Sequence, residues 1–246
     1  MKKLTVFCAA ACLAASAAAQ NHPDLHEVLD RQKGRNLIEI PKGTYTLDVR
    51  NNGPYKFHNL TDVHINGNGS TVICNNQEQA FSFYNCVRVE LRDLTIDYDP
   101  LCFTQGEITA VAEDGSWFDV RIDEGYPVTG LAANRVQFYD PQTRLLKRNS
   151  ITTYTSNYSA LKQLGHNLFR AVKNGTWSAG EQVGDLVVMD VKTDKPNAGV
   201  HTVMLNKCYN TKLENVTVYG SNTFSFFEKE GYANEYRNCV VDRGPM

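Results

Sequence analysis

Acidic side chains are the residues of this sequence whose types and spacing could support catalysis. Hydrolysis of a glycosidic bond uses two carboxyl groups, roughly 5 Å apart when the configuration is retained and about 6.5–9.5 Å apart when it is inverted. The candidates for such a pair are Asp97, Asp99, Glu228, Glu230 and Asp242. Asp97 and Asp99 are two positions apart and would share one face of a strand, but together with Pro100 they also fit a structural turn.

The charged residues near the end of the sequence are the candidates for binding a substrate. Glu228 and Glu230 follow an aromatic segment and could project from a strand into a cleft, or they could be solvated strand charges. Asp242 and Arg243 are adjacent, and they could contact a substrate or form a local ion pair. We predict Glu228, Glu230, Asp242 and Arg243 as substrate-binding residues and assign no catalytic residue.

Aromatic side chains are the second feature that could bind a sugar, because each ring offers a flat apolar face. A group of them precedes Glu228, namely Tyr219, Phe224, Phe226 and Phe227, with Asn222 among them. Packing inside the fold is the alternative interpretation of these rings. Trp117 and Trp177 lie elsewhere in the sequence, and we expect them to fill a core.

Charge and composition exclude several classes of protein. The 246 residues carry 25 Lys and Arg against 27 Asp and Glu, so no basic stripe for nucleic acid is expected. A hydrophobic fraction of 42% is too high for a disordered chain. No apolar run beyond the N-terminus reaches the roughly 18 residues of a membrane span. The histidines lack metal-ligand spacing and the aspartates do not cluster, so we predict neither a metal nor a cofactor.

Residues 1–19 have the composition of a secretory signal. Two lysines precede an apolar stretch that ends in small residues, and we expect cleavage after Ala19. A lipid anchor at Cys12 and a buried N-terminal helix are the alternatives. The signal predicts a secreted or periplasmic bacterial protein.

An internal repeat organises the rest of the chain. Residues 83–98 align with residues 205–220: each segment has an apolar residue, a cysteine, a short alternating strand, an Asp or Asn turn and a second short strand. Weaker copies occur at residues 57–73 and 234–241. Such a repeat of β-branched strands and Asn/Gly turns predicts a parallel β-helix. A leucine-rich repeat has a similar period, but its Leu-x-x-Leu-x-Leu pattern is missing.

Stacked coils bring like residues to like positions, because successive strands lie about 4.8 Å apart. Leu91 should therefore lie against Leu213, and Ile65, which is 26 residues before Leu91, should lie on its other side. Asn residues at the turns are expected to hydrogen-bond to the next coil. Cys86 should lie against Cys208, as a stacked thiol pair or as a disulfide. We favour thiols, because the odd number of cysteines after the signal cannot all pair.

The coils are interrupted by a segment that does not keep the period. We predict a cap and first coils over residues 20–100, an insertion over residues 101–200 and further coils over residues 201–246. Pro23–Gly34 is the expected capping helix, and Ile38–Leu47 is the expected first coil. The strand candidates of the insertion lie between Gly-rich turns, at residues 106–112, 117–122, 136–139, 151–154, 168–172 and 185–191. They predict a small antiparallel β-barrel or sandwich, so the fold class is all-β.

The stretch Leu94–Gly106, LTIDYDPLCFTQG, resembles the secreted bacterial α-1,3-galactosidases of glycoside hydrolase family 110. That family forms right-handed parallel β-helices. The IEIPKGTY opening at residues 38–45 and the barrel-like interruption fit the same pattern, although many pectin-lyase-like β-helices share the opening. The resemblance covers nearly all of the mature chain. It implies a right-handed β-helix that releases terminal α-galactose from an oligosaccharide or polysaccharide without a cofactor.

The sequence departs from that family in the motifs of catalysis. By resemblance, the catalytic carboxylates belong to an Asp-Gly-x-His motif and a later Gly-Asp-Asp motif, and neither occurs here. The chain stops at residue 246 in mid-coil. We therefore expect the N-terminal part of a longer enzyme, inactive by itself. A pectate-lyase-like polysaccharide lyase and a non-catalytic carbohydrate-binding β-helix protein are the alternatives.

Overall fold

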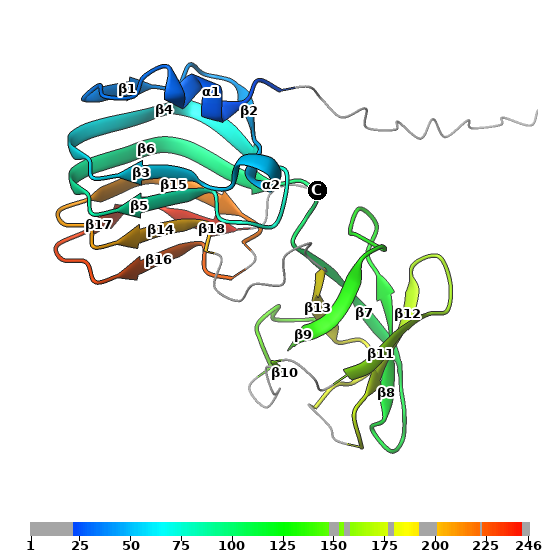
Figure 1. Cartoon of the computed structure of the whole chain (residues 1–246). Coiled ribbons are helices and arrows are strands. Elements are labelled where there is room, and N and C mark those ends of the chain that lie inside the picture. Colours follow the sequence, from blue (N-terminus) through cyan, green and yellow to red (C-terminus); the bar gives the residue numbers. More distant parts are fainter. Residues whose placement is uncertain are drawn as a thin grey trace, which may run out of the picture.

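Parallel strands stacked in two sheets form one part of the molecule, and an antiparallel sheet forms the other (Figure 1). The computed structural model describes residues 22–147, 153–154, 158–176, 180–191, 201–221 and 223–242. The fold confirms the predicted all-β class, a parallel β-helix with an antiparallel insertion.

The long sheet of the β-helix runs through successive coils in the order β1 and β2, β4, β6, β15, and then β17 and β18. Its strands are β1 (Leu37–Glu39), β2 (Thr44–Leu47), β4 (Thr61–Cys74), β6 (Val87–Tyr98), β15 (Lys212–Tyr219), β17 (Glu235–Arg237) and β18 (Val240–Asp242). The short sheet faces it across the core and contains β3 (Tyr55–His58), β5 (Phe81–Tyr84), β14 (Val203–Asn206) and β16 (Phe226–Lys229).

Two short helices lie near the first coils. Helix α1 (Leu25–Asp30) buries Leu25 and Leu29, and the Asp24 side chain caps it by accepting a hydrogen bond from the His26 amide. This confirms the predicted capping helix. Helix α2 (Val49–Asn52) was not predicted, because one turn carries too little periodicity to be recognised.

The core of the β-helix consists of columns of like residues, as the repeat predicted. Ile65 pairs with Leu91, and Leu91 pairs with Leu213 in the next coil. All three side chains are at most 1% exposed. Phe57 and Phe83 form a second column in the short sheet, with stacked rings 4.7 Å apart. Each inward residue is therefore buried by its counterpart on the neighbouring coil.

The turns between strands also stack. Asn59, Asn85, Lys207 and Glu230 occupy one turn position in successive coils, and each has a positive φ between 53° and 56°. Asn tolerates this left-handed conformation better than most residues do. The Asn85 amide donates to the Asn59 side-chain oxygen at 2.7 Å, as expected for stacked turn residues.

The second predicted turn column behaves in the same way. The Asn215 amide donates to Asp93 at 2.8 Å, and the Asn238 amide donates to Asn215 at 3.2 Å. Asp93 and Asn215 are 122 residues apart in sequence, because the insertion separates their coils. The coils therefore continue in register on either side of the insertion.

The insertion sheet has the strand order β10-β9-β13-β7-β8-β12-β11. Its strands are β7 (Phe103–Val111), β8 (Trp117–Ile122), β9 (Leu131–Tyr139), β10 (Thr153–Tyr154), β11 (Tyr158–Gln163), β12 (Leu168–Lys173) and β13 (Leu186–Val191). The predicted hairpin of β7 and β8 and the strands β9, β10, β12 and β13 are confirmed. Strand β11 was missed, because its sequence YSALKQ has no β-branched residue.

Polar contacts close the neck where the chain leaves and re-enters the β-helix. The Tyr98 hydroxyl, at the end of β6, lies 2.9 Å from the Thr202 hydroxyl, just before β14. The Thr202 carbonyl also accepts hydrogen bonds from the backbone amides of Ala80 and Phe81 at 3.0 Å. The hydroxyl contact joins the two ends of the insertion directly, and the amide contacts join the returning chain to the start of β5.

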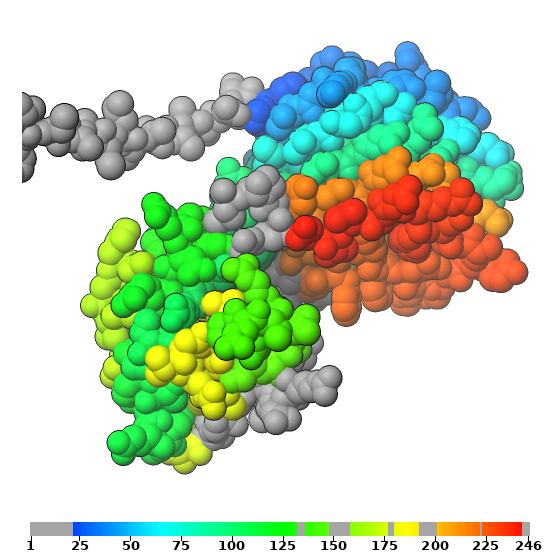
Figure 2. Space-filling view, turned by 180° about the vertical axis from the view of Figure 1, so that it is seen from behind, coloured from blue at the N-terminus to red at the C-terminus, as the bar shows by residue number. Residues whose placement is uncertain are grey.

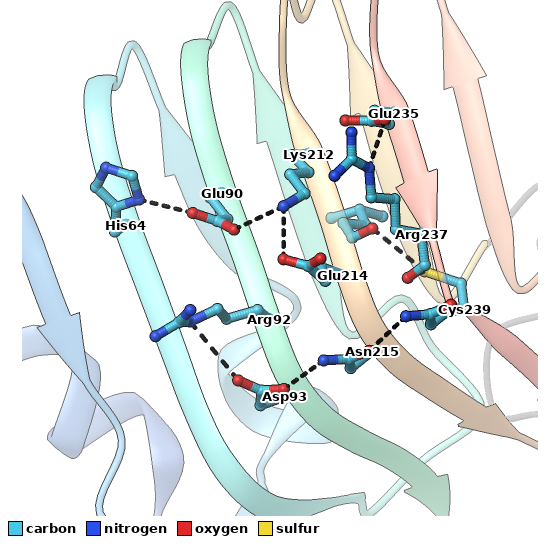
Figure 3. A network of polar contacts seen from close by, with 12 residues as sticks. His64, Glu90, Arg92, Asp93, Lys212, Glu214, Asn215, Glu235, Arg237 and Cys239 are labelled. Carbon is cyan, nitrogen blue, oxygen red and sulfur yellow. Dashed lines mark hydrogen bonds and ion pairs between the residues drawn. The ribbon is translucent and has the colours of Figure 1, made fainter.

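Charged side chains of opposite sign lie next to one another on the outer face of the long sheet (Figure 3). Glu90 lies between His64, at 2.8 Å, and Lys212, at 3.3 Å, and Lys212 also contacts Glu214 at 2.5 Å. Partial burial raises the pKa of Glu90, but the hydrogen bonds from His64 and Lys212 outweigh it and hold the pKa below its usual value. Opposite charges therefore stabilise neighbouring coils on the outside, as apolar columns do inside.

We predict that Leu91→Ala destabilises the β-helix by about 2–5 kcal/mol, because it opens a cavity in a column of buried side chains. Leu37→Ala is the matched control, since Leu37 lies in the same sheet and is 54% exposed. Urea unfolding measures both changes. Equal effects of the two substitutions would contradict the stacked core.

We also predict that Glu90→Gln lowers the free energy of unfolding by about 1 kcal/mol at neutral pH. Because the folded-state pKa of Glu90 is depressed, its contribution is present above the usual pKa of 4.5 and is lost as the pH falls below it. The difference between the two proteins should therefore shrink in acid. Glu27→Gln, at a helical carboxylate whose side chain is 66% exposed, is the control and should show little difference at any pH.

Candidate functional site

A cleft of about 1130 Å³ lies between the insertion sheet and the coils that follow it. Its walls come from β7, β9 and β13 on one side and from the ends of the later coils on the other. Figure 2 shows the insertion, coloured green to yellow, beside the orange and red coils. A second hollow, near α1, is smaller, at about 260 Å³.

Strand alternation determines which side chains of the insertion line the cleft. Val136, Phe138 and Val187 point into the core of the insertion and are fully buried. The alternating positions face the other way, and there Gln105, Val188 and Gln137 lie directly opposite one another on adjacent strands, so that two amides flank one apolar side chain.

Hydrogen bonds orient these two amides. Gln105 donates to the Asp123 carboxylate at 2.9 Å, and the Tyr139 hydroxyl donates to the Gln137 carbonyl oxygen at 2.8 Å. The amide nitrogen of Gln137 has no protein partner among the described residues. It can therefore donate to a ligand hydroxyl.

The residue next to Gln105, Gly106, allows the strands to pair closely at this point of the cleft wall. Gly106 pairs with both Val187 and Ile122, and a Cβ at this position would overlap the Arg121 carbonyl oxygen. Only a residue without a side chain allows β7 and β8 to pair so closely here. The Thr-Gln-Gly segment that carried the family resemblance therefore forms part of the cleft wall.

Aromatic rings form the opposite wall. His201 stacks on Phe227 with ring centroids 4.0 Å apart, and Phe224 lies parallel to Phe227 at 6.0 Å. The Phe224 ring is 61% exposed, and both it and His201 line the cleft. The His201 Nδ1 lies 2.8 Å from the Thr223 hydroxyl, and burial lowers the pKa of His201. The ring is therefore neutral near pH 7, and the stack presents an apolar face to the cleft.

The charged side chains of the cleft are few. Asp190 and Asp242 contribute carboxylates, and Arg144 contributes a guanidinium group. With His201 neutral, the described lining carries an excess of one negative charge. Such a surface suits a neutral ligand with many hydroxyl groups better than an anionic one.

The structure separates the predicted substrate-binding residues. Asp242, the last residue of β18, lines the cleft, whereas Glu228 and Glu230 do not. Arg243 lies outside the described residues. The cleft therefore contains one of the predicted residues whose positions are described.

Glu228 and Glu230 instead form hydrogen bonds and an ion pair within the last coils. Glu228 accepts hydrogen bonds from the Asn234 amide at 2.9 Å and the Tyr236 hydroxyl at 3.2 Å. Burial, and then the Glu228 charge, raise the pKa of Tyr236. Glu230 occupies the stacked turn position and lies 3.7 Å from Lys207 of the preceding coil. Sequence alone could not distinguish these contacts from a binding role, because a carboxylate within a strand or just after it suits either one.

Asp97 and Asp99 lie at the neck of the insertion and do not line the cleft. Asp97 accepts a hydrogen bond from the Tyr98 amide at 2.7 Å, and its burial raises its pKa. Asp99 is exposed and precedes Pro100 at the bend out of β6. These positions fit the alternative of a structural turn.

The aromatic candidates lie in different surroundings. Phe226 packs against the core of the β-helix, whereas Phe224 is exposed to the cleft. Trp117 was expected in the core of the insertion, but it is half-buried beneath the Arg170 guanidinium, 3.5 Å from the ring centroid. Asn222 and Trp177 lie outside the described residues.

Several lining residues were not predicted, because their positions depend on how the insertion meets the coils. They are Gln105, Gln137, Tyr139, Arg144, Asp190, His201, Ser221 and Thr223. The signal closest to them was the Thr-Gln-Gly segment of the resemblance, which contains Gln105. The alternation of side chains along β9 and β13 would have shown which residues share a face of the sheet. It would not have shown which other part of the chain lies opposite that face.

Comparison with known proteins identifies no family for the chain. No protein-family model matches it, and no curated protein matches it significantly. The described residues include no cluster of three or more His, Cys, Asp or Glu side chains that could hold a metal ion. Among these residues, no helix is both long and apolar enough to cross a membrane.

Proposed function

We propose that this chain belongs to a secreted glycoside hydrolase acting on glycans with terminal α-galactose, and that the cleft holds the glycan. The observation that carries the proposal is the pairing of an exposed aromatic stack with a row of amides across one cleft. Sugar rings have an apolar face and a rim of hydroxyls, so a site for them needs both kinds of wall.

The dimensions of the cleft support this proposal. Its volume of about 1130 Å³ is slightly above the roughly 300–1,000 Å³ of small-molecule sites and suits more than one sugar ring. Phe224 would stack on one ring, while Gln137, Ser221 and Thr223 would bond its hydroxyls. Galactose is proposed from the resemblance of residues 94–106, where Gly106 and Gln105 shape the cleft wall.

Hydrolysis requires two carboxyl groups across the scissile bond. Asp190 and Asp242 lie on opposite walls of the cleft, but neither belongs to the motifs that the resemblance associates with catalysis. We therefore propose that this chain binds the glycan without cleaving it. A polysaccharide lyase is less well supported, because its anionic substrate would meet a cleft with excess negative charge.

We predict that the purified chain binds an oligosaccharide ending in α-1,3-linked galactose and releases no galactose. Isothermal titration calorimetry measures the affinity, and a galactose assay measures turnover. The same oligosaccharide without its terminal galactose should bind at least tenfold more weakly. Equal binding of the two would favour a general carbohydrate-binding protein, and calcium-dependent formation of an unsaturated product from polygalacturonate would favour a lyase.

We further predict that Phe224→Ala weakens this binding roughly tenfold, because it removes the exposed face of the stack. Tyr232→Ala is the matched control, since Tyr232 is 73% exposed and does not line the cleft. Its affinity should stay within about twofold of the unsubstituted chain. Thermal unfolding verifies that both variants are folded. An unchanged affinity in Phe224→Ala would remove this cleft as the binding site.

A further inference from the structure

Two buried cysteines meet between the coil that precedes the insertion in sequence and the coil that follows it. Cys86 follows β5 by two residues, and Cys208 follows β14 by two residues. The two strands pair in register up to Asn206 and Tyr84, and Val87 then pairs with Tyr209. The cysteines therefore occupy the same position in consecutive coils.

Contact between the two side chains agrees with this register. Both residues are 0% exposed, and each thiol is the main cause of the shift in the other's pKa, while the Cys86 thiol donates to the Phe57 carbonyl oxygen at 3.1 Å. Residues paired on neighbouring strands have Cα atoms about 4.8 Å apart, within the roughly 4.4–6.8 Å that a disulfide spans. Both thiols are free in this structure, as the odd number of cysteines favoured.

We propose that Cys86 and Cys208 are a disulfide-forming pair that links the coil before the insertion to the coil after it. The link would enclose residues 87–207, which contain the whole insertion sheet. A crosslink between residues so far apart in sequence strongly restricts the unfolded chain. It would hold the two coils together without any contribution from the insertion.

The two thiols influence each other's titration in the folded chain, which agrees with their close approach. Contact with Cys208 is the main cause that lowers the pKa of Cys86 to about 7, and the same contact raises the pKa of Cys208, so the two thiols share a proton as one unit. Burial raises the pKa of the other two buried thiols, Cys74 and Cys102, so both are less reactive as nucleophiles. Cys239 is half-buried and lies on a later coil.

Oxidised glutathione can serve as the oxidant. The Cys86 thiolate attacks its disulfide, forms a mixed disulfide and releases one glutathione thiolate. The Cys208 thiolate then attacks the Cys86 sulfur and displaces the second glutathione. The two cysteines lose two electrons and two protons, and one glutathione disulfide becomes two thiols. Because both sulfurs are buried in the folded chain, the exchange takes place during folding.

Refolding of the full chain in reduced and oxidised glutathione tests the proposal. After free thiols are alkylated, peptide mapping by mass spectrometry should find Cys86 joined to Cys208. The melting temperature should exceed that of the reduced chain by roughly 10 °C. Dithiothreitol added during a second refolding should abolish both results.

Two variants provide the controls. Cys208→Ala should show no increase in melting temperature in the oxidising buffer, whereas Cys102→Ser, which alters a buried thiol outside the pair, should retain the bond and the increase. If either variant fails to fold, the peptide map of the unsubstituted chain decides. Recovery of Cys86 and Cys208 as alkylated thiols, or of Cys86 bonded to another cysteine, would overturn the proposal.

Discussion

The register between successive coils is the constraint on which the rest of this structure depends. A coil of the β-helix cannot bury its own inward side chains, and its backbone groups need partners on the coils above and below. The Ile65–Leu91–Leu213 column meets the first need, and the parallel pairing of β4, β6 and β15 meets the second. A shift of one residue would turn every inward side chain outward.

The same register explains how a long insertion is tolerated. Strands β6 and β15 pair as direct neighbours, although Asp93 and Asn215, which are bonded between them, are 122 residues apart. The entropy needed to close a loop grows only slowly with its length. The hydrogen bond between the Tyr98 and Thr202 hydroxyls joins the chain to the coil again at the point where the chain returns. The insertion can therefore form its own core without disturbing the stack.

The position of the insertion creates the cleft. One face of the insertion sheet is used for its core, so the other face presents Gln105 and Gln137. Where this face meets the later coils, the Phe224 ring is exposed instead of buried, and it lies beside the buried His201 ring. An exposed aromatic stack opposite oriented amides has no role in stabilising either core. This is why we connect the cleft with ligand binding.

The sequence by itself determined the parts of this protein that repeat. The stacked columns, the Asn turns, the capping helix and the β7–β8 hairpin could all be predicted, because each depends on neighbours at a regular spacing. Strand β11 was not predicted, because it has no β-branched residue. Trp117 was expected to fill the core of the insertion, but it lies half-buried beneath Arg170.

The tertiary structure alone decided the candidate site. Glu228 and Asp242 are both acidic residues of short strands, yet one is bonded within a coil and the other lines the cleft. Gln105 and His201 carry no local pattern that marks them. Their meeting depends on the orientation of the insertion against the coils, and that orientation arises from contacts between segments far apart in the chain, which no local periodicity encodes.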